Sequence, residues 1–399
     1  MPAMSPVSRR RTFLTVVGKA TLGMTAAAAA GCGRPEPATT GDASSTPATL
    51  VPHLEQLLPR WMADAMSPGL AIGLVRDGRL FWQRGFGVAD RDVGTPIHDG
   101  TIFEVGSMSK PVFACAVLQL HDDGLIDLDT PLIKYMPGRI VEADARADLI
   151  TARHVLSHTS GLPNWRSGSE PLALQFTPGD RWLYSGEAYY YLQSVVTHLT
   201  GRVSRNVCGT YEGDLEVCAS DIDAFMKARL LVPLGMTSSG YIWTQTLAAR
   251  SARPHDARGS VMTKAHPNAA DAARYASAGG LHATIGDYAR FMIGLLEPAP
   301  GDGVRLRGDT MEMMVRPAVP VSERPLRSSW ALGWQVLHTD AGNVIAHGGD
   351  NPGFHAFAAA SRAMRSGFLI MTNGDGGAKV IERMIAEPGL IDRLVGNET

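Results

Sequence analysis

Ser107-Met108-Ser109-Lys110 is the stretch that most restricts the possible folds of this sequence, because it puts a hydroxyl and an amine three residues apart. On a helix, positions i and i+3 lie on one face, so the Lys110 amine can reach the Ser107 oxygen and accept its proton. Such a pair makes a nucleophile. The pattern alone is loose, and a chain of this length can contain it by chance.

The residues around Lys110 predict a helix. Apolar side chains recur at near-helical spacing up to Gly124: Phe113, Val117, Leu118 and Leu120. Pro111 lacks an N–H and is tolerated only in a first helical turn, so the helix is expected to begin at or just before Ser107. The hydroxyl would then lie at the positive end of the helix dipole, where an oxyanion is stabilised and a neighbouring ammonium is disfavoured.

The composition is that of a soluble globular protein with a large core, since 45% of the 399 residues are hydrophobic and 19% are charged. Residues 1–31 are interpreted as an export signal peptide, because three arginines precede an apolar, alanine-rich run. Arg10-Arg11-Thr12-Phe13-Leu14 resembles a twin-arginine signal. Gly18, Lys19 and Gly23 interrupt the run, which argues against a permanent membrane-spanning helix of about 20 apolar residues.

Cys32 follows Ala29-Ala30-Gly31, and this sequence resembles a lipobox, in which Cys32 becomes the lipid-modified first residue after cleavage. The alternative is an ordinary cleaved signal with an incidental cysteine. Residues 33–49 contain no Leu, Ile, Val or aromatic residue, so residues 32–49 are expected to form a flexible tether. We therefore expect an exported lipoprotein, anchored to a membrane on the periplasmic or cell-surface side.

The net charge gives no indication of nucleic-acid binding. Residues 1–31 contain four basic residues and no acidic one, so their removal changes the formal net charge from −2 to −6. Cys208 and Cys218 flank a polar stretch and could close a local disulfide loop in an oxidising compartment. Cys115 is expected to be a small buried apolar residue.

Strand patterns occur near both ends of the chain. An Asp77-Gly78 hairpin signal joins alternating runs at 70–75 and 80–86, and further strands are predicted at 331–337, 344–347, 354–360 and 368–372. The prediction is an α+β domain over residues 50–399, with an antiparallel sheet from about 50–105 and 325–399. N- and C-terminal helices would flank this sheet, and a mostly helical lobe would be inserted from about 106 to 324.

Two more clusters of residues support a catalytic role for Ser107 and Lys110. Tyr184 stands in a turn before an aromatic-rich helix, and His347-Gly348-Gly349-Asp350 ends a strand with glycines that let a ligand approach the backbone. With Ser107 and Lys110, these clusters resemble the serine β-lactamase-like hydrolases, the superfamily of class C β-lactamases, D-alanyl-D-alanine carboxypeptidases and family VIII esterases. The likeness covers roughly residues 53–390, and further landmarks stand in the expected order: Gly85–Asp90, Phe103–Ser107, Ile150–Pro163, Ala278–Leu281 and Leu332–Trp334.

The resemblance implies a β-lactamase/transpeptidase-like fold and a role for each matching residue. Ser107 would be the acylated nucleophile, Lys110 its proton acceptor, and Tyr184 the residue that passes protons to the leaving group and in deacylation. The backbone N–H groups of Ser107 and Asp350 would form the oxyanion hole. Gly186 and the stretch His347-Gly348-Gly349 would contact the substrate. The resemblance implies no metal and no organic cofactor.

Two positions depart from the class C pattern. Tyr-x-Asn reads Tyr184-Ser185-Gly186 here, so the amide that would hold a substrate acylamino group is missing. Lys-Thr-Gly reads His347-Gly348-Gly349, which replaces a permanent cation with a group that is mostly neutral at pH 7. Both changes favour an esterase or a peptidase-like enzyme over a β-lactamase, and both leave the acyl-enzyme machinery intact.

Two alternatives stay open at this point, and a third, a zinc site, is disfavoured. One is a β-lactamase or a D-amino-acid peptidase, which would also act on a small-molecule or peptide acyl substrate. Another is a non-catalytic module that holds cell-wall peptide, although a pure receptor needs no activated nucleophile. His154 and His158 could share a zinc ion on one helix, but the glutamate of H-E-x-x-H is missing. The sequence patterns specify neither the acyl group nor the oligomeric state.

Overall fold

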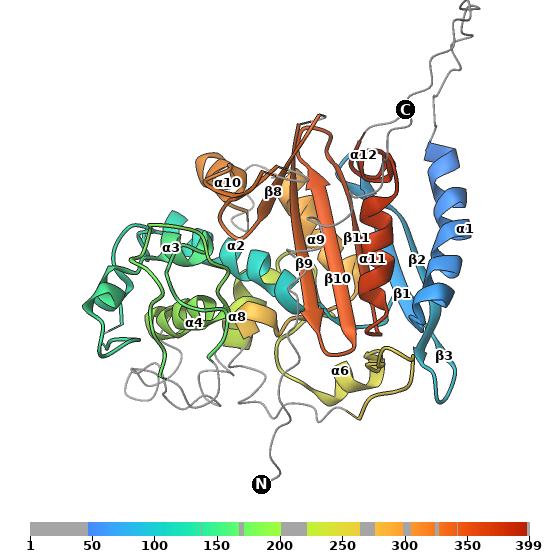
Figure 1. Ribbon diagram of the computed structural model, residues 1–399, viewed down its shortest axis with the longest axis horizontal. Coiled ribbons are helices and arrows are strands. Elements are labelled where there is room, and N and C mark those ends of the chain that lie inside the picture. Colours follow the sequence, from blue (N-terminus) through green and yellow to red (C-terminus); the bar gives the residue numbers. More distant parts are fainter. Residues whose placement is uncertain are drawn as a thin grey trace, which may run out of the picture.

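The computed structural model describes residues 47–136, 138–166, 171–200, 222–263, 276–297, 305–323, 327–340 and 342–396. Figure 1 shows a sheet covered by helices on one side of the molecule and a mostly helical lobe on the other. The α+β prediction is therefore confirmed.

One nine-stranded sheet has the order β3-β2-β1-β11-β10-β9-β8-β7-β6, and all its neighbouring pairs are antiparallel. Its strands are β1 (Gly69–Arg76), β2 (Arg79–Asp90), β3 (Thr95–Pro96), β6 (Val319–Ser322), β7 (Ser328–Trp330), β8 (Gln335–Thr339), β9 (Gly342–Asn351), β10 (Phe354–Ser361) and β11 (Ser366–Thr372). β1 lies between β2 and the C-terminal strand β11, so the two ends of the chain together build the middle of one sheet.

The β1–β2 hairpin closes where the sequence predicts it. Arg76 pairs with Arg79, which leaves Asp77 and Gly78 as a two-residue loop. Both loop residues have positive φ, 48° at Asp77 and 69° at Gly78. Loops of this kind match the right-handed twist of the paired strands, and aspartate and glycine tolerate the left-handed conformation.

Helices cover both faces of the sheet (Figure 1). α1 (Pro47–Ala65), α11 (Gly377–Ala386) and α12 (Leu390–Val395) pack on one face, and α9 (Ile285–Leu296) packs on the other. Alternate side chains of β1 therefore pack into two different hydrophobic cores, one on each face of the sheet. Leu70 and Ile72 join the core beneath α1, whereas Ala71 joins the core shared with the helical lobe.

The helical lobe surrounds one central helix, α2 (Ser109–Asp122), whose residues from Ser109 to Leu120 are all buried. A helix that is buried all round belongs to a core, not to a surface. The other elements described there are η2 (Gly106–Met108), η3 (Leu132–Lys134), η4 (Ala145–Leu149), α3 (Ala152–Leu156), α4 (Gly186–Thr200), η5 (Lys227–Leu231), α6 (Gln245–Arg250), α8 (Ala276–Gly279) and α10 (Gly308–Val315), with the short pair β4 (Phe103–Glu104) and β5 (His282–Ala283). None of the helices that the structure describes is both long and apolar enough to cross a membrane.

Three predicted boundaries are wrong. The strand predicted at 331–337 begins only at Gln335, as β8, and residues 331–334 form a turn between β7 and β8. Gly333 has φ 91°, and the Ala331 N–H donates to the Trp334 carbonyl at 2.8 Å. The sheet already includes β6, which lies before residue 325, since Val319 pairs with Trp330. α1 begins at Pro47, inside the range expected to be tether, and it contains two further prolines, Pro52 and Pro59.

Candidate active site

Ser107 lies in a tight turn that leads directly into the central helix. The turn is the 3₁₀ helix η2, and α2 follows at Ser109, so the α-helix begins two residues later than predicted while Ser107 lies in the helical turn before it. The Ser109 hydroxyl donates to the Gly106 carbonyl at 2.7 Å and accepts the Leu281 N–H at 2.9 Å. The Tyr288 hydroxyl holds the Met108 carbonyl at 2.9 Å. These contacts fix the backbone on both sides of Ser107.

Lys110 reaches Ser107 as the spacing predicts. Its Nζ lies 3.1 Å from Ser107 Oγ and donates to the Ala278 carbonyl at 2.6 Å. The side chain is fully buried, and Nζ lies 4.8 Å from the centre of the Tyr184 ring. Burial lowers the pKa of Lys110 to about 7, because an ammonium without solvent is disfavoured. The contribution of Ala278 could not be predicted, since a backbone carbonyl carries no sequence signal.

Tyr184 completes the group around Ser107. It stands just before α4, and the Ser107 side chain is near enough to the Tyr184 phenol to lower its pKa slightly, against the larger effect of burial. Burial raises the pKa of the Tyr184 phenol well above its ordinary value, and the Asp350 carboxylate acts in the same direction. The phenol therefore keeps its proton at neutral pH. The structure brings the three predicted side chains together, although they come from an η turn, a helix and a loop.

The predicted oxyanion strand lies against the turn that carries Ser107. A Cβ at Gly349 of β9 would lie 1.9 Å from the Val105 carbonyl oxygen and 3.1 Å from the Ser107 nitrogen. A Cβ at Gly106, where φ is 53°, would lie 2.5 Å from the Asp350 nitrogen. Only glycines allow this approach, which places the N–H groups of Ser107 and Asp350 near each other. The Asp350 carboxylate lies 2.5 Å from His355 Nδ1.

His347 is buried and uncharged. Desolvation lowers the pKa of His347 to about 3, with the nearby Lys110 charge acting in the same direction. Its Nδ1 lies 2.7 Å from the Gly348 carbonyl, and its ring lies 6.4 Å from the Tyr184 ring, centre to centre. Among the described residues, Nε2 has no hydrogen-bond partner. His347 thus supplies no positive charge at pH 7, in contrast to the lysine that it replaces.

Gly186 lacks a side chain for a steric reason that the sequence did not reveal. A Cβ at this position would lie 2.4 Å from the ring of Trp165. Hydrogen bonds from the Gly186 and Glu187 N–H groups to the Asn164 carbonyl, at 3.0 and 3.1 Å, hold the tryptophan segment against the start of α4. Trp165 is 42% exposed. An aromatic surface therefore replaces the polar amide of the class C pattern.

Other predicted sites are placed as follows. Cys32, Cys208 and Cys218 lie outside the described residues. Cys115 is a buried free thiol whose pKa burial raises to about 12. Within the described ranges, no group of three or more His, Cys, Asp or Glu side chains is placed to hold a metal ion. α3 ends at Leu156, so His154 and His158 do not share a helix face.

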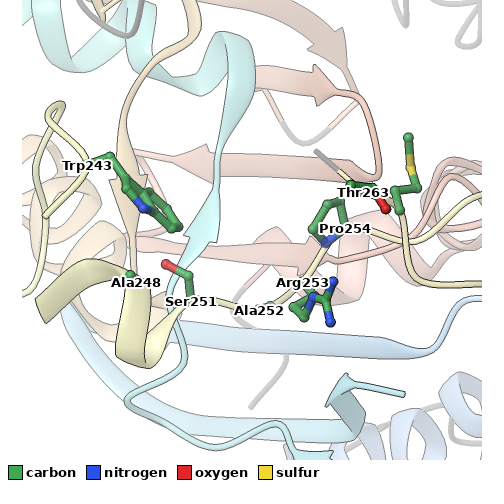
Figure 2. A pocket seen from close by; sticks show the side chains of 8 residues that line it. Trp243, Ala248, Ser251, Ala252, Arg253, Pro254 and Thr263 are labelled. Atoms are coloured by element: carbon green, nitrogen blue, oxygen red, sulfur yellow. The ribbon is translucent and has the colours of Figure 1, made fainter. Parts of the chain in front are cut away.

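A separate cavity of about 220 Å³ lies beside the segment that follows α6 (Figure 2). The indole of Trp243 stands on one side of it, and Arg253 and Pro254 stand on the other. The remaining lining residues are Ala248, Ser251, Ala252, Met262 and Thr263. None of the predicted site residues lines this cavity.

Comparisons with known proteins agree with this geometry. A family model described as Beta-lactamase matches residues 54–387. Esterase EstB from Burkholderia gladioli is 29% identical over 226 residues, which are 49% of this chain and 52% of EstB, so the chain spans only about half of that relative. The Putative penicillin-binding protein PbpX from Bacillus subtilis is 24% identical over 337 residues, 82% of this chain and 75% of PbpX.

Solved structures share the fold at low sequence identity. D-alanine Carboxypeptidase AmpC from Burkholderia cenocepacia superposes with a TM-score of 0.68 at 19% identity, covering 88% of this chain and 99% of that one. The octameric penicillin-binding protein homologue from Pyrococcus abyssi gives 0.67 at 21% identity, with 84% and 76% covered. The fold is thus that of penicillin-binding proteins and β-lactamases. Since the family model also covers most of its length, the chain belongs to the Beta-lactamase family of serine hydrolases.

Proposed function

We propose that this protein is an exported serine hydrolase that cleaves an ester or amide through an acyl-Ser107 intermediate. The observation that carries the proposal is the fully buried Lys110 amine, 3.1 Å from Ser107 Oγ and with its pKa lowered to about 7. A general base must be neutral to accept the serine proton, and burial beside the hydroxyl keeps the lysine amine neutral near pH 7. A lysine with a structural role does not need this environment. Export and a lipid anchor at Cys32 rest on the sequence signals, and fractionation of cells that produce the full chain tests them.

Acylation follows from the positions of the three side chains. Neutral Lys110 takes the hydroxyl proton as Ser107 Oγ bonds to the substrate carbonyl carbon. The N–H groups of Ser107 and Asp350 stabilise the negative oxygen that forms. Tyr184 gives its phenolic proton to the leaving group as the bond to the carbonyl carbon breaks, and it regains a proton from the Lys110 ammonium. The raised pKa of Tyr184 makes it the proton donor and leaves the role of base to Lys110.

Deacylation repeats these steps with water as the nucleophile. Neutral Lys110 takes the proton from the water as the water oxygen bonds to the acyl carbon. Ser107 Oγ then leaves with the phenolic proton of Tyr184, and Tyr184 regains a proton from the Lys110 ammonium. The same N–H groups stabilise the second oxyanion. The products are a carboxylic acid and the free enzyme.

Small esters are expected to be better substrates than β-lactams. His347 offers no cation to a substrate carboxylate, and Trp165 occupies the space of the missing amide, so the anionic, acylamino-bearing antibiotics lose two recognition contacts. We expect kcat/KM for activated short-chain esters to exceed that for penicillins and cephalosporins by roughly 10²-fold or more. Steady-state kinetics of the purified full chain on both classes tests this, with Ser107→Ala as the background. Equal rates on both classes would show that these two differences do not set the substrate preference.

Activity is expected to rise with pH through a midpoint near 7. Lys110 acts as a base only when neutral, and burial lowers its pKa to about 7, so kcat/KM falls below that pH and levels off above it. The pKa of His347 is about 3, and burial also lowers the pKa of His158. Neither histidine can therefore account for the fall in kcat/KM below pH 7. The measurement is kcat/KM for an uncharged ester from about pH 5 to about pH 9.5. A flat profile, or a midpoint near the ordinary lysine value, would contradict the assignment of Lys110 as the base.

A further inference from the structure

His158 has an unusual backbone conformation for a buried residue. It follows α3 and has φ 57°, in the left-handed region that non-glycine residues seldom enter. Its side chain is fully buried. A conformation of this kind is unfavourable for a non-glycine residue and persists only where the surrounding structure holds it, often at functional sites. The contacts that hold His158 are therefore informative.

Those contacts lie on both sides of Tyr184. The His158 carbonyl accepts the Leu183 N–H at 2.8 Å, and His158 Nδ1 accepts the Ser185 N–H at 3.1 Å. The imidazole ring packs on the Tyr184 ring, with 4.2 Å between the centres and 37° between the planes. One residue thus binds the backbone before and after the tyrosine and also contacts its side chain.

The imidazole acts here as a neutral acceptor. Burial lowers the pKa of His158 well below its usual range, and the Lys110 charge acts in the same direction. Because Nδ1 accepts a hydrogen bond, the ring proton is assigned to Nε2. Nε2 has no partner among the described residues. The histidine therefore gives no charge to the site. It acts through the position of Nδ1, which accepts the Ser185 N–H, and through the contact of its ring with Tyr184.

We propose that His158 is a positioning residue that holds the Tyr184 hydroxyl at Ser107. The inference rests on the proposed role of Tyr184 in proton transfer. The left-handed backbone at His158 lets its carbonyl and its Nδ1 reach the residues on either side of Tyr184. The ring then limits the movement of the phenol toward or away from Ser107. Without the imidazole, Tyr184 keeps its chemistry but loses its fixed position.

A double-mutant cycle with Tyr184→Phe tests the proposal on the full chain. In the native background, His158→Ala is expected to lower kcat for an activated ester by about 10²-fold, with a small change in KM. In the Tyr184→Phe background, the same change is expected to cost less than about 3-fold, because the hydroxyl that it positions is already gone. Equal fold losses in both backgrounds would overturn the proposal, since a general loss of structure acts on both alike.

Two further variants keep the test decisive if His158→Ala folds poorly. Asparagine tolerates positive φ and offers an oxygen acceptor, so His158→Asn should recover most of the lost kcat. His255→Asn is the matched control, because His255 is equally buried but binds the Asn373 carbonyl at 2.7 Å, and it should show no coupling to Tyr184→Phe. Full activity of Tyr184→Phe would instead refute the proposed role of the tyrosine. Loss in Tyr184→Phe with full activity in both His158 variants would refute only the positioning role.

Discussion

Lys110→Met is expected to lower kcat/KM for ester hydrolysis by roughly 10³–10⁴-fold and, at the same time, to make the protein more stable. Activity falls because Ser107 loses the group that takes its proton, 3.1 Å away. Stability rises because the fold no longer has to bury an amine. The loss of the hydrogen bond to the Ala278 carbonyl offsets part of the gain.

The gain in stability of Lys110→Met should become smaller as the pH rises. The pKa of Lys110 is about 7 in the fold and 10.5 ordinarily, so between these values the unfolded chain holds a proton that the folded chain does not. Stability of the native protein therefore rises with pH across this window, and the full cost of burial is present below pH 7. We expect Lys110→Met to gain roughly 1–3 kcal/mol near pH 7 and progressively less toward pH 10.

Thermal unfolding at several pH values measures this effect. Lys134→Met is the control, because Lys134 is exposed in η3 and should change neither stability nor activity by much. A lower melting temperature in Lys110→Met, or a gain that does not change with pH, would contradict the burial argument. Retained activity would remove Lys110 from the mechanism.

Gly349→Ala is expected to damage the oxyanion site through a single methyl group. The new Cβ would lie 1.9 Å from the Val105 oxygen and 3.1 Å from the Ser107 nitrogen, so β9 must move away from η2. This movement separates the N–H groups of Ser107 and Asp350. We expect kcat to fall by about 10²–10³-fold and the free energy of unfolding by about 1–3 kcal/mol.

Gly308→Ala serves as the control for this change. A Cβ at Gly308 meets nothing within 4 Å, so its effect on kcat and on melting temperature should be small. Native kcat in Gly349→Ala would show that the close approach of β9 to the turn is not needed for catalysis. A fall in stability with unchanged kcat would separate the packing role of Gly349 from the oxyanion site.

Much of the fold could be predicted because its signals are local. The Asp77-Gly78 turn, the alternation in β1 and the helical spacing after Ser107 all depend on near neighbours in the chain. The errors arose where tertiary contacts decide the conformation. The run 331–337 has a strand-like composition, but Gly333 donates its N–H to the Leu156 carbonyl at 2.9 Å and the chain turns there.

The residues of the candidate site also fall into those that could be predicted from the sequence and those that could not. Ser107, Lys110 and Tyr184 could be found because each stands in a motif whose residue types carry chemistry. Trp165 and Ala278 could not, since one acts through a contact across a loop and the other through its backbone carbonyl. In the sequence, His158 stands out only within the landmark Ile150–Pro163 and as one of two histidines that could share a zinc ion. Its left-handed φ and its two contacts beside Tyr184 depend on the folded chain.

The central claim is that Ser107 becomes acylated during turnover. The most direct measurement is the intact mass of the full chain, quenched in acid during its first turnovers with an activated short-chain ester, followed by peptide mapping. The account predicts one acyl group on the peptide that contains Ser107, and no such group in Ser107→Ala, which should also be inactive. Turnover of the ester without an adduct on Ser107, or full activity in Ser107→Ala, would contradict it.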